Sequence, residues 1–311
     1  MAGLDPGIVV VGPTASGKSR LGIGLARRHG GEILGCDALQ LYRGMDVGTA
    51  KATAAERLGV PHHMIDILDP TEEFSAGAYS SRARAVLEDI RGRRRIPLVV
   101  GGTGFYLRAL LEGLFAGPSR DEALRARMRR IIERGGPGRL HRALGRVDPA
   151  SAARIAAADG ERIIRAYEIY LSSGRPMSWW QGRPRDALGG WRWLKIGIRL
   201  PRAVLYARID ARVDAMFRAG LLEEVRGLVE RFGHGAPAFK GIGYRQAVRH
   251  LDGALSLEEA VEETKRESRR YAKRQSTWFG RDPEIAWIDD DGESLEEKAD
   301  RLVARFLDSG A

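Results

Sequence analysis

Cysteine is almost absent from this chain, since Cys36 is the single cysteine among 311 residues. One cysteine excludes an internal disulfide and any zinc module built from several cysteines, and it is typical of a reducing compartment. No apolar run approaches the roughly 20 residues that cross a bilayer, and residues 1–7 lack the features of a secretory signal. We therefore expect a cytoplasmic protein with no membrane partner. Nothing in the sequence requires self-association, so we expect a monomer.

Acidic residues are the minority among the charged ones: 41 Asp and Glu stand against 51 Lys and Arg, which gives a net charge of +10. This excess indicates an anionic partner larger than one nucleotide, and a nucleic acid is the leading candidate. Because arginine greatly outnumbers lysine, genome composition can explain part of the excess. The hydrophobic content of 43% is that of a globular protein, and the length suits one large domain plus a smaller one.

A glycine-rich loop directly follows the apolar run Ile8–Val11. It reads Gly12, Pro13, Thr14, Ala15, Ser16, Gly17, Lys18 and Ser19, and it fits the pattern G-x-x-x-x-G-K-S/T. A strand, this loop and a helix expected over 20–28 form a phosphate cradle, in which backbone N–H groups and the helix dipole face the anion. Lys18 can reach the terminal phosphate oxygens and Ser19 can ligate Mg²⁺. We predict a bound di- or triphosphate with Mg²⁺ as cofactor; the alternative is a chance match in a glycine-rich chain.

Strand-like and helix-like segments alternate over the first hundred residues. This alternation predicts an α/β fold, with a P-loop three-layer core around a parallel sheet. We expect strands over 8–11, 32–36, 64–68, 96–100, 195–200 and 286–288, and helices over 78–91, 208–219 and 221–232.

Between residues 118 and 194 the strand pattern stops and arginine becomes dense. Helical patterns cover 122–133 and 150–171. We predict a helical insertion domain over 118–194, and a catalytic core over 1–117 and 195–311. A solvated helix face is the alternative explanation for most of these arginines, which are Arg120, Arg125, Arg127, Arg129, Arg130, Arg134, Arg139, Arg142 and Arg146.

Two further loops at expected strand ends carry polar side chains. Asp37 follows the second strand, where a carboxylate can accept a proton from a nucleophile that attacks a group held in the cradle; the alternative is a cap on the next turn. Thr103 can donate into the same cleft, although a simple turn residue is the more common case. The strand over 97–100 is followed by Gly101 and Gly102 rather than by the acid with which nucleotide hydrolases hold Mg²⁺. This absence weakens an ATPase or GTPase interpretation.

A basic stripe lies near the C-terminus. On a helix, Arg266, Arg270 and Arg274 would form one row, and Lys265, Arg269 and Lys273 an adjacent row. Such a stripe can follow a phosphodiester backbone while an aromatic residue stacks on a base. Trp278 and Phe279 end the stripe, and for these two we favour burial in the core.

These segments are similar to those of a known family, the tRNA dimethylallyltransferases, also called tRNA isopentenyltransferases. The resemblance extends over almost the whole chain. It is carried by residues 12–19, 39–51, 61–66, 101–107, 243–246 and 272–279. Each segment alone is weak, but their order and spacing together are highly specific.

The resemblance implies transfer of a dimethylallyl group from dimethylallyl diphosphate to N6 of the adenosine immediately 3′ of the anticodon in tRNA, with release of diphosphate. The loop would then hold a prenyl diphosphate instead of ATP. By resemblance Asp37 is the general base on the amine, Arg212 binds the diphosphate with Lys18 and with Ser19 and its Mg²⁺, and Thr103 contacts the substrate.

The resemblance also implies a set of contacts to the anticodon stem-loop, including contacts from the insertion domain. The residues are Asp37, Ala38, Leu39, Gln40, Thr103, Arg125, Glu161, Arg162, Ile163, Ile164, Arg165, Lys240, Gly241, Ile242, Gly243, Tyr244, Arg245, Lys273, Arg274, Gln275, Ser276, Thr277, Trp278 and Phe279. Two positions depart from the family pattern: Ala38 replaces a serine, and Gly280 separates Phe279 from Arg281.

Two other interpretations remain open at this point. A small-molecule phosphotransferase would share the phosphate loop and the aspartate, but it leaves the basic stripe unexplained. An RNA-binding protein with a nucleotide switch would explain the stripe, but the missing acid after the strand at 97–100 counts against it.

Overall fold

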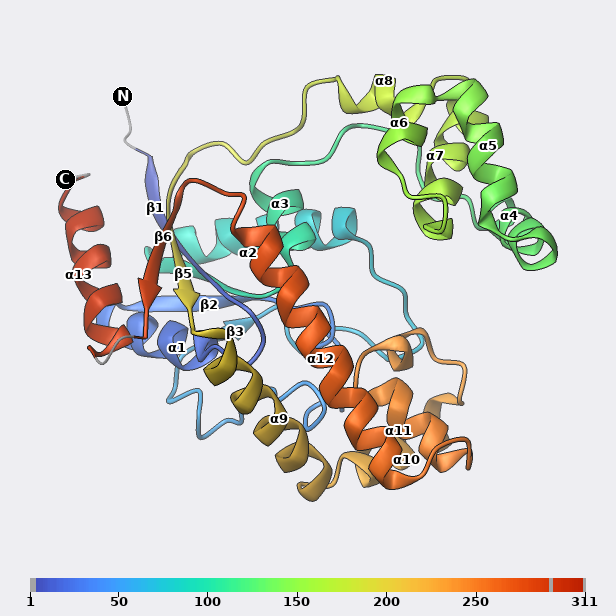
Figure 1. The fold of residues 1–311 in the computed structure, drawn as a ribbon. Coiled ribbons are helices and arrows are strands. Elements are labelled where there is room, and N and C mark those ends of the chain that lie inside the picture. The colour runs from blue at the N-terminus through green and yellow to red at the C-terminus, as the bar shows by residue number, and fades with distance from the viewer. Residues whose placement is uncertain (1–3, 291–292, 310–311) are drawn as a thin grey trace. The chain divides into compact units, whose positions relative to one another are not determined.

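The computed structural model describes residues 4–290 and 293–309. Their contacts divide the chain into two compact units. The first unit comprises Met1–Leu111 and Leu188–Ala311, and the second, Glu112–Ala187, is inserted between these parts (Figure 1). The sequence pattern places the limits of the insertion at 118 and 194, whereas the compact unit runs from 112 to 187.

A six-stranded sheet forms the centre of the first unit, and all of its strand pairs are parallel. Its order is β3-β2-β4-β1-β5-β6. The strands are β1 (Asp5–Val11), β2 (Gly31–Cys36), β3 (His62–His63), β4 (Ile96–Gly101), β5 (Trp191–Arg199) and β6 (Ile285–Asp289). The predicted α/β class is therefore confirmed.

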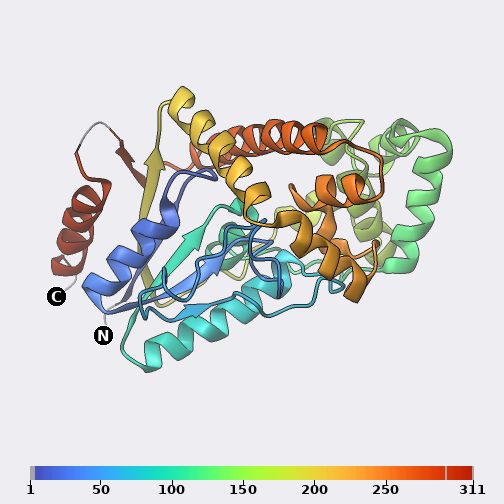
Figure 2. The same cartoon turned by 90° about the horizontal axis from the view of Figure 1, so that it is seen from below.

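Helices cover both faces of this sheet (Figure 2). Helices α1 (Lys18–His29) and α13 (Leu295–Asp308) pack on one face, and α2 (Ala76–Gly92) and α3 (Gly104–Leu111) on the other. The unit also contains the helical elements α9 (Arg202–Arg218), α10 (Leu221–Phe232), the 3-10 turn η1 (Pro237–Lys240), α11 (Tyr244–Leu251) and α12 (Leu257–Phe279). Helices α9 and α12 lie side by side in both views (Figures 1 and 2).

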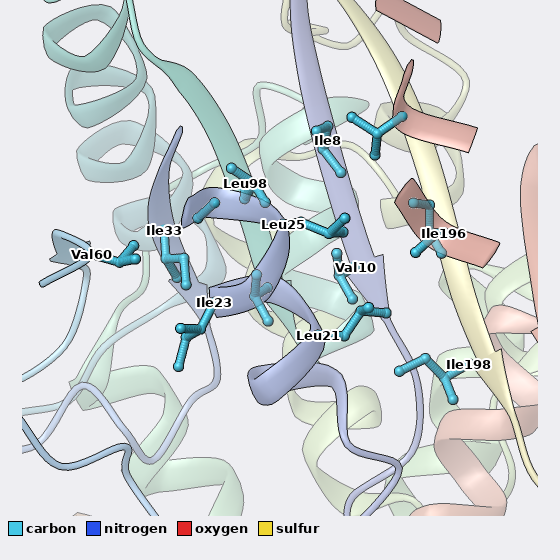
Figure 3. Close-up of a cluster of buried hydrophobic side chains, with 14 of the residues drawn as sticks. Ile8, Val10, Leu21, Ile23, Leu25, Ile33, Val60, Leu98, Ile196 and Ile198 are labelled. Atoms are coloured by element: carbon cyan, nitrogen blue, oxygen red, sulfur yellow. The ribbon is translucent and has the colours of Figure 1, made fainter. Parts of the chain in front are cut away.

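The strands are continuous apolar runs because both faces of the sheet are covered. Figure 3 shows Ile8 and Val10 of β1 against Leu21 and Leu25 of α1, and all four are buried. The close approach of α1 to β4 also requires a small residue on the helix, because a Cβ at Gly22 would lie 2.7 Å from a methyl group of Val100. This packing fixes the start of α1, and thereby the loop before it.

Two expected elements differ in the structure. The strand expected over 64–68 is absent from the described sheet, because Met64 and Asp66 have positive φ (59° and 54°), which an extended strand cannot accommodate. The helix expected over 150–171 is broken into α6 (Pro149–Arg154) and α7 (Gly160–Ser173). The side chain of Asp159 accepts a hydrogen bond from the N–H of Arg162 and starts α7 anew.

The second unit is a small helical bundle with its own core. It contains α4 (Glu122–Gly135), α5 (Pro137–Val147), α6, α7 and α8 (Met177–Gln181). Its buried apolar residues are Leu144, Ile155, Ile163, Ala166, Ile169 and Met177. In the described parts of both units, no helix is long and apolar enough to cross a membrane.

Candidate active site

The glycine-rich loop joins β1 to α1 at the carboxyl edge of the sheet. Gly17 has a φ of 91° and Ala15 a φ of 63°, so the loop turns through left-handed conformations. A Cβ at Gly12 would lie 2.7 Å from the hydroxyl of Ser16. Gly17 offers no side-chain cap to α1, which leaves N–H groups of the first turn for an anion.

The hydroxyl of Ser16 is an unusual feature of this loop. It is buried and finds no hydrogen-bond partner among the described residues. Buried hydroxyls are normally paired. A bound phosphate group would provide the acceptor that this loop lacks.

Lys18 begins α1 and turns back over the loop, where its ammonium donates to the carbonyl of Pro13 at 3.3 Å. Burial lowers the pKa of Lys18 to about 8, while the nearby carboxylate of Asp37 acts in the opposite direction. The guanidinium of Arg212 lowers the same pKa further. Two cations thus share one carboxylate, and a diphosphate would balance the excess positive charge.

Asp37 follows β2, and β4 separates β2 from β1 in the sheet. The register is level, since Cys36 of β2 and Val11 of β1 both pair with Gly101 of β4. Asp37 is therefore one strand removed from the phosphate loop, and not its immediate neighbour. It is still within electrostatic reach of Lys18.

The carboxylate of Asp37 is oriented by its own turn. Its Oδ1 accepts N–H groups from Leu39 (3.0 Å) and Gln40 (3.4 Å). The capping interpretation is therefore correct for one oxygen, but it does not exclude a chemical role, because Asp37 also lines a cavity. Thr103 lies beside it: its hydroxyl accepts the N–H of Ala38 at 3.1 Å. Ala38 therefore contributes its backbone to this contact, whatever its side chain.

Arg212 reaches this region from α9. Its Nη2 donates to the carbonyl of Thr49 at 3.0 Å. Burial lowers the pKa of Arg212, and Asp37 raises it. The structure thus brings Lys18, Asp37, Thr103 and Arg212 together from four separate segments of the chain.

A cavity of about 420 Å³ lies within the first unit, and Asp37, Thr103 and Arg212 line it. This size is typical of sites that hold a small organic ligand. The polar and charged part of the lining also includes Thr14. The apolar part of the lining consists of Leu39, Ile209, Val213, Met216 and Ile242. The cavity therefore suits a ligand with a charged end and a short hydrocarbon part.

The residues of the loop fit a magnesium ion that is held mainly by the bound diphosphate and only in part by the protein. Ser19 is exposed at the start of α1 and offers one hydroxyl. Among residues 4–290 and 293–309, no group of three His, Cys, Asp or Glu side chains could hold a metal alone. Mg²⁺ commonly takes few protein ligands and several phosphate and water oxygens. Ser19 together with a diphosphate meets this requirement.

Most of the segment over 240–245 lies at the cavity. Lys240, Gly241, Ile242, Gly243 and Arg245 line it, and both cationic residues are exposed. Tyr244 differs, because its side chain is fully buried, and its implied contact with tRNA stays a prediction. Gln40 belongs to another segment with implied tRNA contacts, residues 37–40, and its side-chain amide donates to the carbonyl of Thr49 at 3.3 Å.

Helix α12 brings its C-terminal end to the same site, but not every residue over 273–279 faces outward. Lys273, Arg274, Ser276, Thr277 and Trp278 are exposed, and Arg274 lines the cavity. Gln275 and Phe279 are buried (5% and 3% exposed), and their implied contacts with tRNA stay predictions. The favoured burial of the two aromatics is confirmed for Phe279 and wrong for Trp278, which is 37% exposed.

Gln275 instead joins three parts of the site. Its side-chain oxygen accepts the N–H of Thr14 in the phosphate loop at 2.8 Å, and its amide donates to the carbonyl of Gly102 at 2.9 Å. The cradle is therefore attached both to β4 and to the basic helix.

The basic stripe of α12 is only partly a free surface. Lys265 pairs with Asp214 at 2.8 Å and Arg269 with Asp210 at 2.5 Å, so these two residues pack against α9. In the outer row Arg266, Arg270 and Arg274 are exposed, as is Lys273. The exposed charge of the stripe thus comes from these four residues, of which Arg270 pairs with Glu267 of the same helix.

In the second unit most of the implied contacts are structural. Arg125 is 8% exposed and pairs with Glu168 and Glu161, while Ile163 and Ile164 lie in the core. These three side chains therefore have structural roles in the unit, and their implied tRNA contacts stay predictions. Others on α7 are closer to the surface: Arg165 pairs with Glu168, Arg162 with Asp159, and Glu161 also with Arg129. Exposed arginines elsewhere on the unit include Arg127, Arg130, Arg134, Arg139, Arg142 and Arg146.

Sequence reasoning missed two features of the site. Tyr271 lines the cavity beside Thr103, and burial raises its pKa to about 12, so it stays protonated. Its helical spacing from Arg274 and Gln275 could have indicated a shared face. Glu224 supports the cavity wall from α10, and no sequence pattern pointed to it.

The parallel sheet with a phosphate loop at its carboxyl edge defines a P-loop α/β protein. Its site combines an anion cradle, a carboxylate and an apolar wall. The family profile described as IPP transferase matches residues 40–282, and the profile described as isopentenyl transferase matches residues 8–67. The chain therefore belongs to the IPP transferase family, the tRNA dimethylallyltransferases, which confirms the resemblance predicted from the sequence.

Similar proteins support this membership along the whole chain. The tRNA dimethylallyltransferase of Koribacter versatilis (strain Ellin345) is 50% identical over 282 residues, which cover 90% of this chain and 91% of that protein. That of Solibacter usitatus (strain Ellin6076) is 49% identical over 305 residues, 97% and 99% of the two chains.

Solved structures give the same result. The tRNA isopentenylpyrophosphate transferase of Bacillus halodurans has a TM-score of 0.72 at 38% identity, with 98% of this chain and 96% of that chain covered. A eukaryotic dimethylallyltransferase acting on tRNA has a TM-score of 0.81 at 26% identity, with 99% and 80% covered.

Proposed function

We propose that this enzyme transfers a dimethylallyl group from dimethylallyl diphosphate to N6 of the adenosine immediately 3′ of the anticodon in tRNA, and releases diphosphate. The observation that carries this proposal is the cavity itself. Its lining combines Asp37, Arg212 and Thr14 of the phosphate loop with apolar side chains that suit a short prenyl chain. Lys18 lies within electrostatic reach of both Asp37 and Arg212.

The chemistry follows from these positions. An exocyclic adenine amine is a weak nucleophile, so departure of the leaving group must supply most of the activation. As the allylic C1–O bond breaks, negative charge grows on the diphosphate, and the loop amides, Lys18 and Arg212 stabilise it. The bond from N6 to C1 forms, and Asp37 takes the proton that N6 loses. Mg²⁺, held through Ser19, supplies further neutralisation of the leaving diphosphate when bound.

The exposed cations around the cavity favour a large anionic acceptor. Lys240, Arg245, Lys273 and Arg274 belong to three segments of the first unit, η1, α11 and α12, and all are exposed. A base in an anticodon loop is already partly unstacked, so its entry into a cavity costs about a few kcal/mol. We propose that these residues hold the anticodon stem-loop, that exposed arginines of the second unit add further contacts, and that the enzyme acts as a monomer in the cytoplasm.

A small-molecule phosphotransferase is the second candidate. It would use the same loop, and Asp37 could activate a hydroxyl. The apolar wall and the exposed cations speak against it, because a γ-phosphate transfer between small polar molecules requires neither.

The decisive experiment combines the protein with Mg²⁺, unmodified tRNA and dimethylallyl diphosphate labelled in its prenyl group. We expect label in the tRNA, and none when the adenosine 3′ of the anticodon is replaced by guanosine. Label that appears only from the γ-phosphate of ATP would instead support the phosphotransferase.

The role of Asp37 is tested in the same assay. Asp37→Ala should abolish transfer and leave diphosphate and tRNA binding within about twofold. A variant that keeps a near-normal rate would remove Asp37 from the role of base.

A further inference from the structure

Glu224 lies in the first turn of α10, outside the cavity, and collects four hydrogen bonds on one carboxylate. Its Oε2 accepts the N–H groups of Asp46 (2.9 Å) and Val47 (2.7 Å). Its Oε1 accepts the N–H of Gly48 (3.2 Å) and the hydroxyl of Tyr244 (2.5 Å). Three successive backbone groups of one loop are thus bound to a single side chain.

The loop that Glu224 holds forms a wall of the active site. Gly48 and Thr49 line the cavity. Gly48 also packs closely against Tyr244, since a Cβ at this position would lie 2.5 Å from the tyrosine ring. The hydroxyl of Thr49 donates to the carbonyl of Met45 at 2.7 Å, which closes the turn. The segment therefore has little freedom to move while Glu224 remains in place.

This segment has one direct contact with the proposed diphosphate site. The carbonyl of Thr49 accepts the Nη2 of Arg212 at 3.0 Å. An arginine enclosed next to a carboxylate is drawn toward it, and the side chain of Asp37 lies within electrostatic reach of Arg212. The Thr49 carbonyl is a second acceptor for this guanidinium, and its position depends on the loop that Glu224 binds.

We propose that Glu224 is a positioning residue for the diphosphate: by fixing the loop at 46–48 it fixes the Thr49 carbonyl, and thereby the orientation of Arg212 at the leaving group. This inference rests on the proposed function and adds a residue that touches neither substrate. The coupling runs through contiguous contacts: Glu224 binds the N–H groups of residues 46–48, and the next carbonyl, that of Thr49, binds Arg212.

Tyr244 strengthens the same arrangement from α11. Burial and the adjacent carboxylate of Glu224 raise the pKa of its hydroxyl well above the ordinary value, so it remains a donor. The hydroxyl and the three amides together satisfy the carboxylate with donors only. A carboxamide at position 224 would have to turn its own N–H groups toward at least one of these donors.

The experiment measures the binding of inorganic diphosphate in the presence of Mg²⁺ by calorimetry. We expect Glu224→Gln to weaken binding about tenfold, because Arg212 loses its fixed orientation. Glu223→Gln is the matched control: it removes the same charge one residue earlier, where the side chain is exposed, and should change binding less than twofold. Binding of tRNA should be unchanged by both substitutions.

A double-mutant cycle separates positioning from a merely structural role. In an Arg212→Ala background, Glu224→Gln should weaken diphosphate binding no further, because the group that it orients is gone. An equal loss in both backgrounds would overturn the proposal, as would unchanged binding in the single variant.

Two further variants test the same inference. If Glu224→Gln fails to fold, Tyr244→Phe takes its place in the cycle. It removes one hydrogen-bond donor and should give a smaller loss of diphosphate binding that again depends on Arg212. Lys18→Ala tests whether the diphosphate binds at the phosphate loop. A wild-type protein that binds no diphosphate would refute the proposed function, whereas binding that requires Lys18 but ignores Glu224 would refute only the positioning role.

Discussion

Gln275 offers a direct test of how the basic helix and the phosphate loop depend on each other. The resemblance assigns this residue to the tRNA interface, but the structure buries it between Thr14 and Gly102. We consider Gln275→Leu, which keeps a similar volume and removes both hydrogen-bonding groups. The N–H of Thr14 and the carbonyl of Gly102 then lose their partner.

The magnitude follows from these two bonds. A buried polar group left without a partner costs about 1–3 kcal/mol, and part of this cost is recovered if water enters beside the loop. We expect a loss of about 3 kcal/mol in the free energy of unfolding, which in a chain of this length lowers the melting temperature by roughly 5 °C. Because Thr14 belongs to the cradle, the KM for dimethylallyl diphosphate should rise about tenfold.

The assay compares three quantities in the same preparation: melting temperature, KM for the diphosphate and Kd for tRNA. Thr277→Ala is the control, because Thr277 is exposed two residues further along the same helix. The reasoning is refuted if Gln275→Leu weakens tRNA binding while the KM for the diphosphate stays normal, since that is the behaviour of an interface residue.

Three other predictions follow from the same geometry. Burial lowers the pKa of Lys18 to about 8, so folding disfavours its charged form, and stability increases as the pH rises from about 8 to 10.5. Lys18→Met should therefore raise the free energy of unfolding at pH 7 by roughly 2–3 kcal/mol, and it should abolish diphosphate binding. Thermal melts at pH 7 and above pH 10.5 check this, and a gain that persists undiminished at the higher pH would contradict the burial argument. Neutralising Arg270, Lys273 and Arg274 should reduce the salt dependence of tRNA binding by about two to three counterions. Neutralising Lys265 and Arg269 should mainly reduce stability, because those two residues pair with α9. Equal salt slopes for the two sets of variants would contradict this difference. Arg125→Ala should destabilise the second unit by about 1–3 kcal/mol, because buried Glu168 loses one charged partner and keeps Arg165 and the N–H of Asp121. Proteolysis confined to residues 112–187 would report this loss. Unchanged protease resistance would return Arg125 to the surface role that the resemblance implies.

Several parts of the site could be predicted from the sequence because their signals are local. The phosphate loop is a contiguous run whose glycines and lysine have fixed functions, and the apolar run before it indicates a buried strand. Asp37 and Thr103 could be placed at strand ends for the same reason, since parallel strands finish at one edge. Their separation by β4 could not, because strand order depends on packing between distant segments.

Helical periodicity was informative about position but not about neighbours. It located the two rows of α12, yet it could not show that Asp214 and Asp210 of α9 pair with Lys265 and Arg269 in one of these rows. It likewise predicted a helix over 150–171, where the cap at Asp159 starts a new one. Turns with positive φ at Met64 and Asp66 left no readable pattern, so the strand expected there was wrong.

The sequence by itself determined the kind of chemistry: a run of eight residues can build an anion cradle only in one way, because backbone N–H groups and a helix terminus do most of the binding. Tertiary structure decided which groups share that cradle. Arg212, Gln275 and Glu224 lie far from the loop along the chain, and they reach it only because α9, α10 and α12 pack around the carboxyl edge of the sheet. Contacts between distant segments are set by the packing of whole elements, and no short stretch of sequence encodes them.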